Sequence, residues 1–168
     1  WKYAESRVRF SEIYDGEIYD ASYESVFYHN AVSFDGPSNT LISQQGEEIH
    51  EQEHLAAACI FTTPKGETVI DFGQEVTGYV ESHLEGKAGE VLDLSFAEVM
   101  DKEGNFYTEN YRSAKARYHY ICRDGKQTYK PKLTFWGFRY IRVNAFPGGI
   151  DKVTLDAFTA IAVHSDMK

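Results

Sequence analysis

The stretch V-L-D-L-S-F-A-E-V, residues 91–99, alternates between two kinds of side chain. One set of alternate positions is mainly apolar and the other is polar or small: Leu92, Leu94, Phe96 and Glu98 against Asp93, Ser95 and Ala97. Successive side chains of a β-strand point to opposite faces, so this period of two predicts a half-buried strand. The stretch therefore predicts a fold built from sheets.

Further strand-like segments lie on both sides of this stretch, separated by turn residues. No long segment follows the 3.6-residue period of a helix. The expected strands cover 7–13, 17–23, 41–45, 49–55, 59–62, 67–72, 78–84, 116–122, 127–130, 138–146 and 153–163. Asp15-Gly16 and Asp124-Gly125 are hairpin dipeptides, so we expect a hairpin at each. The predicted fold class is all-β, an antiparallel, jelly-roll-like β-sandwich with little helix.

Length and charge limit the function classes. At 168 residues the chain suits one domain, or one domain and part of another. Its formal net charge of −9 argues against a nucleic acid or an anionic membrane surface as partner. The sequence contains no apolar run long enough to predict a membrane span. Because it opens at Trp1 without a methionine, we interpret it as a piece of a longer protein, which leaves a cytoplasmic or a secreted location open.

The two cysteines, Cys59 and Cys122, both stand in apolar, strand-like runs. We expect two small buried side chains, with a disulfide between them as the alternative. Neither cysteine has the spacing of a zinc site or a redox pair.

His50-Glu51-Gln52-Glu53-His54 matches the H-E-x-x-H pattern of zinc proteases. That chemistry needs a helix, which places residues four apart within about 6 Å of one another. On a strand the same two histidines lie about 13 Å apart and cannot share one zinc ion. We expect a strand here and therefore no metal site.

The purified protein is predicted to hold far less than one equivalent of zinc, because an extended segment separates the two imidazoles. Elemental analysis by mass spectrometry checks this, and a stoichiometric zinc content would overturn the strand assignment.

Candidate site residues gather in and beside the segment 98–112. Trp136, Tyr140, Tyr107 and Tyr111 could stack on sugar rings, with Asn110, Arg112 and Arg139 to bind hydroxyls. The alternative is that these aromatics fill the core, which we favour for Phe138 and Tyr140, whereas we expect Trp136 to be more open.

Carboxylates near the same segment provide a second set of candidates. Asp71 and Gln74, in D-F-G-Q at 71–74, either cap loops or face a cleft. Glu98, Asp101, Glu103 and Glu109 could supply the facing pair that glycoside hydrolysis needs, but a solvated acidic loop is the usual outcome.

Six phrases together carry a resemblance to a known family. They are V-I-D-F-G-Q at 69–74, G-Y-V at 78–80, F-A-E-V-M at 96–100, G-N-F-Y-T-E-N-Y-R at 104–112, Y-K-P-K-L-T-F at 129–135 and G-F-R-Y-I-R-V at 137–143. Their order and spacing resemble the bacterial α-L-rhamnosidases of glycoside hydrolase family 78. The resemblance implies a non-catalytic β-sandwich module, 39–168, with 1–38 as the end of a preceding accessory sandwich and linker.

In that family an (α/α)6 barrel follows the module and carries the acid and base of an inverting hydrolysis. The resemblance thus implies two partners, this catalytic domain and a rhamnose-containing glycan, and no catalytic residue here. A carbohydrate-binding module with its own rhamnose site is the alternative. No cofactor is implied except calcium, which some neighbouring sandwiches use to bind rhamnose; Asp20 is the weak candidate ligand. Trp136 departs from the histidine usual in the family at this position.

Overall fold

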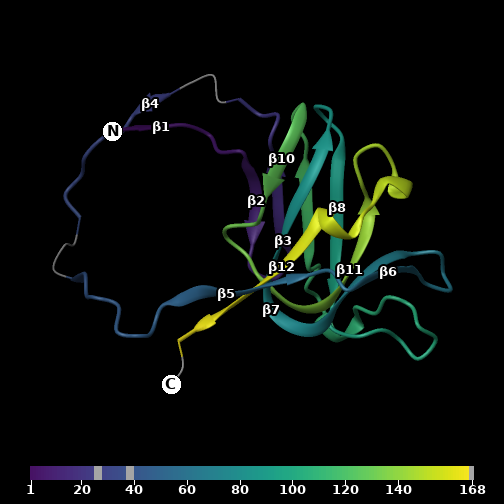
Figure 1. The fold of residues 1–168 in the computed structure, drawn as a ribbon. Helices are drawn as coiled ribbons and strands as arrows, with labels where there is room; N and C mark the ends of the chain where they lie inside the picture. Colours follow the sequence, from purple (N-terminus) through teal and green to yellow (C-terminus); the bar gives the residue numbers. More distant parts are fainter. Residues whose placement is uncertain (25–27, 37–39, 167–168) are drawn as a thin grey trace.

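The computed structural model describes residues 1–24, 28–36 and 40–166. Ten strands form one sheet that folds over into two facing layers (Figure 1), which confirms the predicted all-β sandwich. The strands are β1 Lys2–Tyr3, β2 Val8–Glu12, β3 Gly16–Asp20, β4 His29–Asn30, β5 Ile49–Ala56, β6 Cys59–Thr62, β7 Thr68–Gly86, β8 Val91–Ala97, β9 Arg117–Ile121, β10 Gly125–Tyr129, β11 Trp136–Ala145 and β12 Phe158–Ser165. The first layer contains β2, β3, β9, β8, β11, the first half of β7 and β6, and the second contains β10, the second half of β7, β12 and β5. Strands β1 and β4 form a separate two-stranded sheet. The described residues include the short 3₁₀ helices η2 Glu109–Tyr111, η3 Ile150–Lys152 and η4 Leu155–Ala157. No helix of the described residues is long and apolar enough to cross a membrane.

Strand β7 belongs to both layers. Its first half pairs with β6 and with the second half of β11, and its second half pairs with β12 and β10. We predicted two strands here, 67–72 and 78–84, but the structure has one strand of 19 residues. Gly73, with φ +84, lies where β7 passes from one layer to the other, and the facing strand β11 carries a register shift between Phe138 and Tyr140. Residues 72–75 of β7 lie opposite the single residue Arg139 of β11, so the extra residues are in β7, and left-handed Gly73 among them lets the strand turn without leaving the ladder.

The core lies between the layers and is rich in aromatic rings. Leu92, Leu94 and Phe96 of β8 are fully buried, as the alternation predicts. The opposite face of β8 is buried too, since Asp93 is 2% and Ala97 0% exposed. The prediction of a half-buried strand is therefore wrong, because polar side chains of the neighbouring strands cover Asp93 and a second apolar cluster with Val69 and Phe106 covers Ala97.

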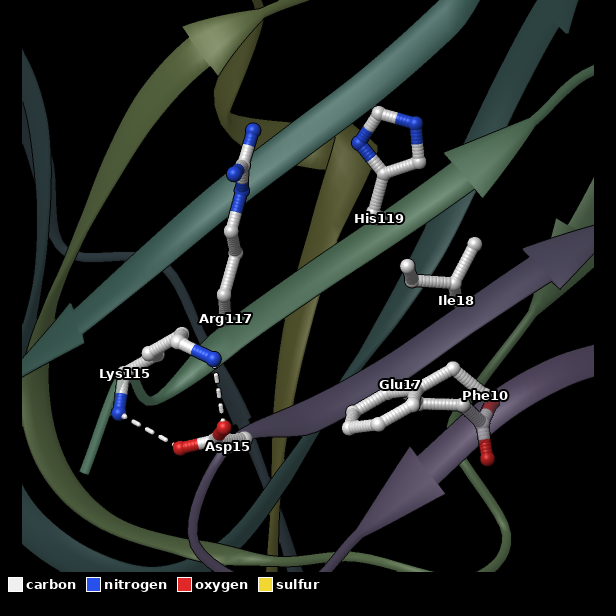
Figure 2. A pocket seen from close by; sticks show the side chains of 7 residues that line it. All are labelled: Phe10, Asp15, Glu17, Ile18, Lys115, Arg117 and His119. Carbon is white, nitrogen blue, oxygen red and sulfur yellow. Dashed lines mark hydrogen bonds and ion pairs between the residues drawn. The ribbon is translucent and has the colours of Figure 1, made fainter.

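The N-terminal hairpin is part of the same sheet. The predicted turn at Asp15-Gly16 is confirmed, and β2 and β3 pair antiparallel around it. However, β3 also pairs in parallel with β9, an exception to the antiparallel pattern. Asp15 accepts a hydrogen bond from Lys115 Nζ at 2.6 Å beside this junction (Figure 2). The predicted boundary at 38/39 falls outside the described residues, and the division there stays a prediction.

Glu17 fixes the hairpin to the second layer. Its side chain is 1% exposed and its Oε1 accepts a hydrogen bond from Tyr129 Oη at 2.6 Å. Burial and this carboxylate both raise the pKa of Tyr129, so the phenol stays protonated and keeps donating. Leaving a buried carboxylate without this donor would reduce the stability of the fold. The contact therefore ties β3 to β10.

Three expectations about local structure are wrong. The residues on either side of Asp124-Gly125 do not form a hairpin, because β9 pairs with β3 and β8 while β10 pairs with β7 in the other layer. Residues 41–45 form no strand. Cys59 is exposed and Cys122 is buried, and both thiols are free, so neither the disulfide nor a pair of buried cysteines is present.

Replacing Gly16 by alanine is predicted to destabilise the fold strongly, because a Cβ there would lie 1.8 Å from Arg117 O and the residue has φ +108. Gly66→Ala is the matched control, since Gly66 has φ +83 but nothing within 4 Å. We expect a loss of about 1–2 kcal/mol for the control, from backbone strain alone, and at least about 3 kcal/mol for Gly16→Ala. Urea unfolding measures both, and equal losses would contradict a tightly packed parallel pair.

Candidate functional site

Most of the candidate residues gather at the end of the sandwich where β7 turns between the layers. Strand β11 passes through this region, with β7 on one side and the end of β8 on the other. The segment 98–116 between β8 and β9 lies beside the first residues of β11. The structure thus gathers these candidates around β11, which itself carries Arg139 and Trp136. Asp71 lies on one side of the strand, and Glu98 and Asn110 lie on the other.

Asp71 and Arg139 form a bidentate ion pair across β7 and β11. Arg139 Nε and Nη2 each donate to a carboxylate oxygen of Asp71 at 2.8 Å, and the Gly73 amide donates to Oδ1 at 2.6 Å. The guanidinium also lies 5.0 Å from the centre of the Tyr140 ring. The hydrogen bonds from Arg139 lower the pKa of Asp71 and outweigh the opposing effect of burial. The pair therefore fixes the turn of β7, and Asp71 is a poor proton donor at neutral pH.

A second polar contact closes the other side of β11. Asn110 Nδ2 donates to Glu98 Oε2 at 2.6 Å, and Tyr111 Oη donates to the Gly137 carbonyl at 2.5 Å. Burial raises the pKa of Tyr111, with Glu98 and Glu75 adding to the effect. Tyr111 thus acts as a neutral donor that holds the 98–116 segment against β11.

The prediction that Trp136 is more open than its neighbours is wrong. Its side chain is 5% exposed and its ring stacks on Phe96 at 4.0 Å, with Phe138 edge-on to Phe96. Phe138 is fully buried as predicted, whereas Tyr140 is only partly buried. Burial of its apolar ring in the core therefore decides the position of Trp136. The indole leaves no broad exposed face on which a sugar could stack.

The remaining candidates are exposed or are occupied by local contacts. Gln74 lies on the turn of β7, and Arg112 follows η2 with φ +58, an uncommon backbone for a side-chain-bearing residue. Asp20 Oδ1 accepts hydrogen bonds from the backbone and side chain of Ser22 and from the Tyr23 amide. No three His, Cys, Asp or Glu side chains gather in a metal-binding arrangement anywhere in the described residues. Asp20 thus holds the turn that follows β3, and its role as a calcium ligand stays a prediction.

The H-E-x-x-H segment lies in β5, as predicted. His50 pairs with His164 and His54 with Ile161 of β12, so the two histidines follow an extended strand. The absence of zinc in the purified protein stays a prediction.

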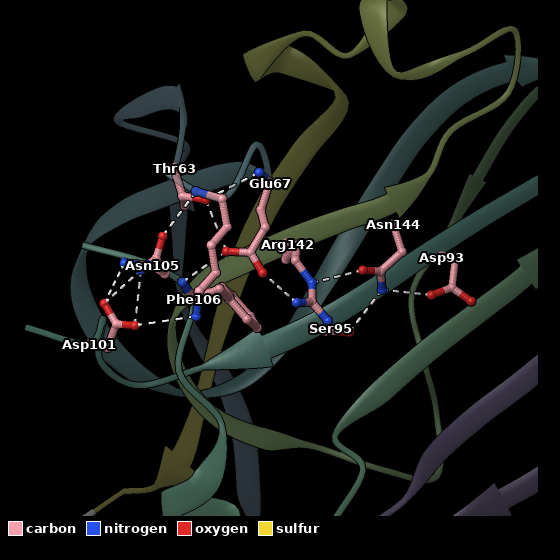
Figure 3. A network of polar contacts seen from close by, with 10 residues as sticks. Thr63, Glu67, Asp93, Ser95, Asp101, Asn105, Phe106, Arg142 and Asn144 are labelled. Atoms are coloured by element: carbon pink, nitrogen blue, oxygen red, sulfur yellow. Dashed lines mark hydrogen bonds and ion pairs between the residues drawn. The ribbon is translucent and has the colours of Figure 1, made fainter. Parts of the chain in front are cut away.

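A polar network that the sequence did not reveal crosses the outer face of the first layer (Figure 3). Glu67 accepts from Arg142 at 2.7 Å, Arg142 donates to Asn144 at 2.8 Å, and Asn144 donates to Asp93 and Ser95 at 2.8 Å. These residues come from β8, from β11 and from the turn just before β7, so their contact depends on strand order. The alternation of polar and apolar residues in β8 and β11 was the one signal in the sequence.

Asp93 is the centre of this network. Arg117 donates to both of its oxygens and His119 Nδ1 lies 2.6 Å from Oδ2. Burial works to raise the pKa of Asp93, but the hydrogen bonds from Arg117, His119 and Asn144 outweigh it, so the pKa is lowered. The residue is a buried carboxylate whose donors come from the side chains on both flanking strands.

Comparison with known proteins agrees with this fold. Residues 61–164 match the family described as the bacterial α-L-rhamnosidase concanavalin-like domain, which is more than half of the chain. The chain belongs to this family. The α-L-rhamnosidase of Streptomyces avermitilis is 32% identical over 98% of this chain, and that of an Alteromonas species is 35% identical over 87%. This concanavalin-like domain spans 17% of the length of each of these two relatives.

Solved structures place the same domain inside larger enzymes. The α-L-rhamnosidase of Aspergillus terreus matches all of this chain with a TM-score of 0.88 and 32% identity, over 20% of its own length. The Streptomyces avermitilis enzyme, solved with L-rhamnose, matches 97% of this chain with a TM-score of 0.82 and 29% identity, over 17% of its own length.

Asp71→Asn is predicted to lower the free energy of unfolding by about 1 kcal/mol at pH 7, because it removes one charge of a partly exposed ion pair. The folded-state pKa of Asp71 is depressed, so its contribution is complete above the unfolded value of about 3.9 and is lost as the pH falls through the folded value. The difference between wild type and variant should therefore shrink below about pH 4.

Urea unfolding between neutral and acidic pH measures this difference. Asp151→Asn is the control, because the Asp151 side chain is 73% exposed in its pair with Lys152 and should contribute nothing measurable. A difference for Asp71→Asn that persists unchanged at acidic pH would contradict the role of its charge.

Proposed function

We propose that this chain is a non-catalytic domain of an α-L-rhamnosidase that hydrolyses terminal α-L-rhamnose from glycosides. In this proposal its role is to support the catalytic (α/α)6 domain of the same enzyme. The observation that carries the proposal is the family match over 61–164 together with relatives of which the chain spans only 17%.

The state of the carboxylates supports a non-catalytic role. An inverting glycosidase needs one carboxylic acid whose pKa is raised so that it can protonate the leaving group. In the described part of the chain, the resolved pKa shifts of buried or half-buried carboxyls such as Asp71, Glu67 and Asp93 are downward, because cationic or amide donors face them. Glu98 and Asp101, earlier candidates, bind Asn110 and Asn105 instead of facing a cavity together.

Exposed apolar side chains support a structural partner. They lie on the N-terminal segment, on the stretch that runs outside the sandwich before β5 (Figure 1) and at the first residue of β5: Trp1, Tyr28, Val32, Phe34, Leu41, Ile42 and Ile49. Large apolar residues concentrated in this way are typical of contacts with another domain. Because the relatives are much longer than this chain, the partner in this proposal is a neighbouring domain of the same enzyme.

A domain exchange tests this function. The segment of the Streptomyces avermitilis α-L-rhamnosidase that matches this chain is replaced by the chain itself, and hydrolysis of a chromogenic α-L-rhamnoside is measured. We expect the chimera to be active, the enzyme lacking the segment to be inactive or insoluble, and the isolated chain to release no rhamnose. Hydrolysis by the isolated chain would contradict the non-catalytic role, and full activity after deletion would contradict the supporting role.

A further inference from the structure

A cavity of about 420 Å³ lies on the outer face of the first layer, between the N-terminal hairpin and β9 (Figure 2). It is far along the sheet from the turn of β7, because β9 and β8 lie between the hairpin and β11. Its size falls within the range of about 300–1,000 Å³ that is usual for small-molecule sites. None of the candidate residues considered above for sugar contact lines it.

The floor of the cavity is apolar and exposed. Phe10 is 43% and Ile18 37% exposed, although both are large apolar residues. Phe10 pairs with Ile18 across β2 and β3, and Ile18 pairs with His119 across β3 and β9. Register therefore places an aromatic ring, an aliphatic side chain and an imidazole in one row, and Figure 2 shows Ile18 between the other two.

The polar wall of the cavity is held rigidly from behind. Arg117 and His119 are two residues apart on β9 and share the buried carboxylate of Asp93. An ionised carboxylate only accepts, so His119 uses Nδ1–H on Asp93 and its Nε2 is left for another partner. The side chain of Arg117 is 55% exposed, so its guanidinium also reaches the cavity while anchored at Nε. Side chains fixed in this way bind a ligand without a large loss of rotamer freedom.

The charges of the cavity are balanced. Asp93 neutralises Arg117 and Asp15 neutralises Lys115 at 2.6 Å, while the carboxylate of Glu17 is turned into the core, where Tyr129 binds it. This arrangement gives no net attraction to an anion. It offers donors and acceptors around an apolar floor, which suits a neutral ring that has C–H groups on one face and hydroxyls at its edge.

We propose that this cavity is a binding site for a neutral pyranose, with the ring or its apolar substituent on Phe10 and Ile18 and its hydroxyls on Arg117 and His119. A 6-deoxy sugar fits better than its 6-hydroxy analogue. Its C6 methyl group packs against Ile18, whereas a C6 hydroxyl in the same place would have no hydrogen-bond partner. The inference does not depend on the supporting role proposed above, since the exchange experiment and the binding experiment measure different properties.

The test is a titration of the isotope-labelled 168-residue chain with L-rhamnose, followed by amide chemical shifts. We expect saturable shifts at Phe10, Ile18, Arg117 and His119, with a Kd of about 1 mM, and weaker binding of L-mannose, its 6-hydroxy analogue. D-galacturonate, an anionic pyranose, should bind more weakly than L-rhamnose. Tighter binding of the anion would overturn the proposal.

Two variants and a matched control locate the site. Phe10→Ala and Ile18→Thr should each raise the Kd for L-rhamnose, the former by about tenfold. Phe135→Ala should leave it unchanged, since Phe135 is equally exposed at 44% but lines a different, smaller cavity beside Trp136. The spectra themselves report whether each variant is folded.

Three further results would overturn the proposal. One is the absence of saturable shifts up to about 50 mM sugar, far above the expected Kd. Another is a set of shifts centred on Tyr14 and Phe135, which would place binding in the smaller cavity. The third is that Phe135→Ala loses binding while Phe10→Ala binds L-rhamnose as tightly as the unchanged chain.

Discussion

The fold depends on a single strand that serves both layers. Strand β7 pairs with β6, β10, β11 and β12, so each layer is hydrogen-bonded to the same backbone. The turn between its halves requires a left-handed residue at Gly73 and the ion pair of Asp71 with Arg139 beside it. Because this pair also fixes the start of β11, the geometry of the end of the sandwich follows from how β7 crosses between layers.

The outer face of the first layer shows how a two-layer fold covers a sheet without a third layer. Long side chains from β9 and β11 lie over β8 and bury Asp93, whose charge is then balanced by Arg117 and hydrogen-bonded by His119 and Asn144. Separating a buried carboxylate from its hydrogen-bond donors reduces stability. The network therefore fixes the positions of those donor side chains that also reach solvent. The cavity beside the hairpin uses two of these prepositioned groups.

Membership of the rhamnosidase concanavalin-like family and the arrangement of the polar groups are consistent with one another. The carboxylates of Asp71, Glu67, Asp93 and Glu98 are engaged by arginine or amide donors, while the most exposed apolar residues lie outside the sandwich. The turn of β7 and the hairpin cavity are separate regions, and only the cavity combines an apolar floor with fixed polar groups.

The sequence by itself determined the β class, the hairpin at Asp15-Gly16, the inner face of β8, and the extended H-E-x-x-H segment, because period and turn chemistry are local properties. Tertiary structure decided what local rules do not contain. Asp124-Gly125 joins two layers instead of closing a hairpin, Trp136 is drawn into the core by stacking on Phe96, and β3 pairs in parallel with β9. The row of Phe10, Ile18 and His119 exists only because β9, about 100 residues away in the sequence, lies beside the N-terminal hairpin, and strand order is set by the packing of the whole core.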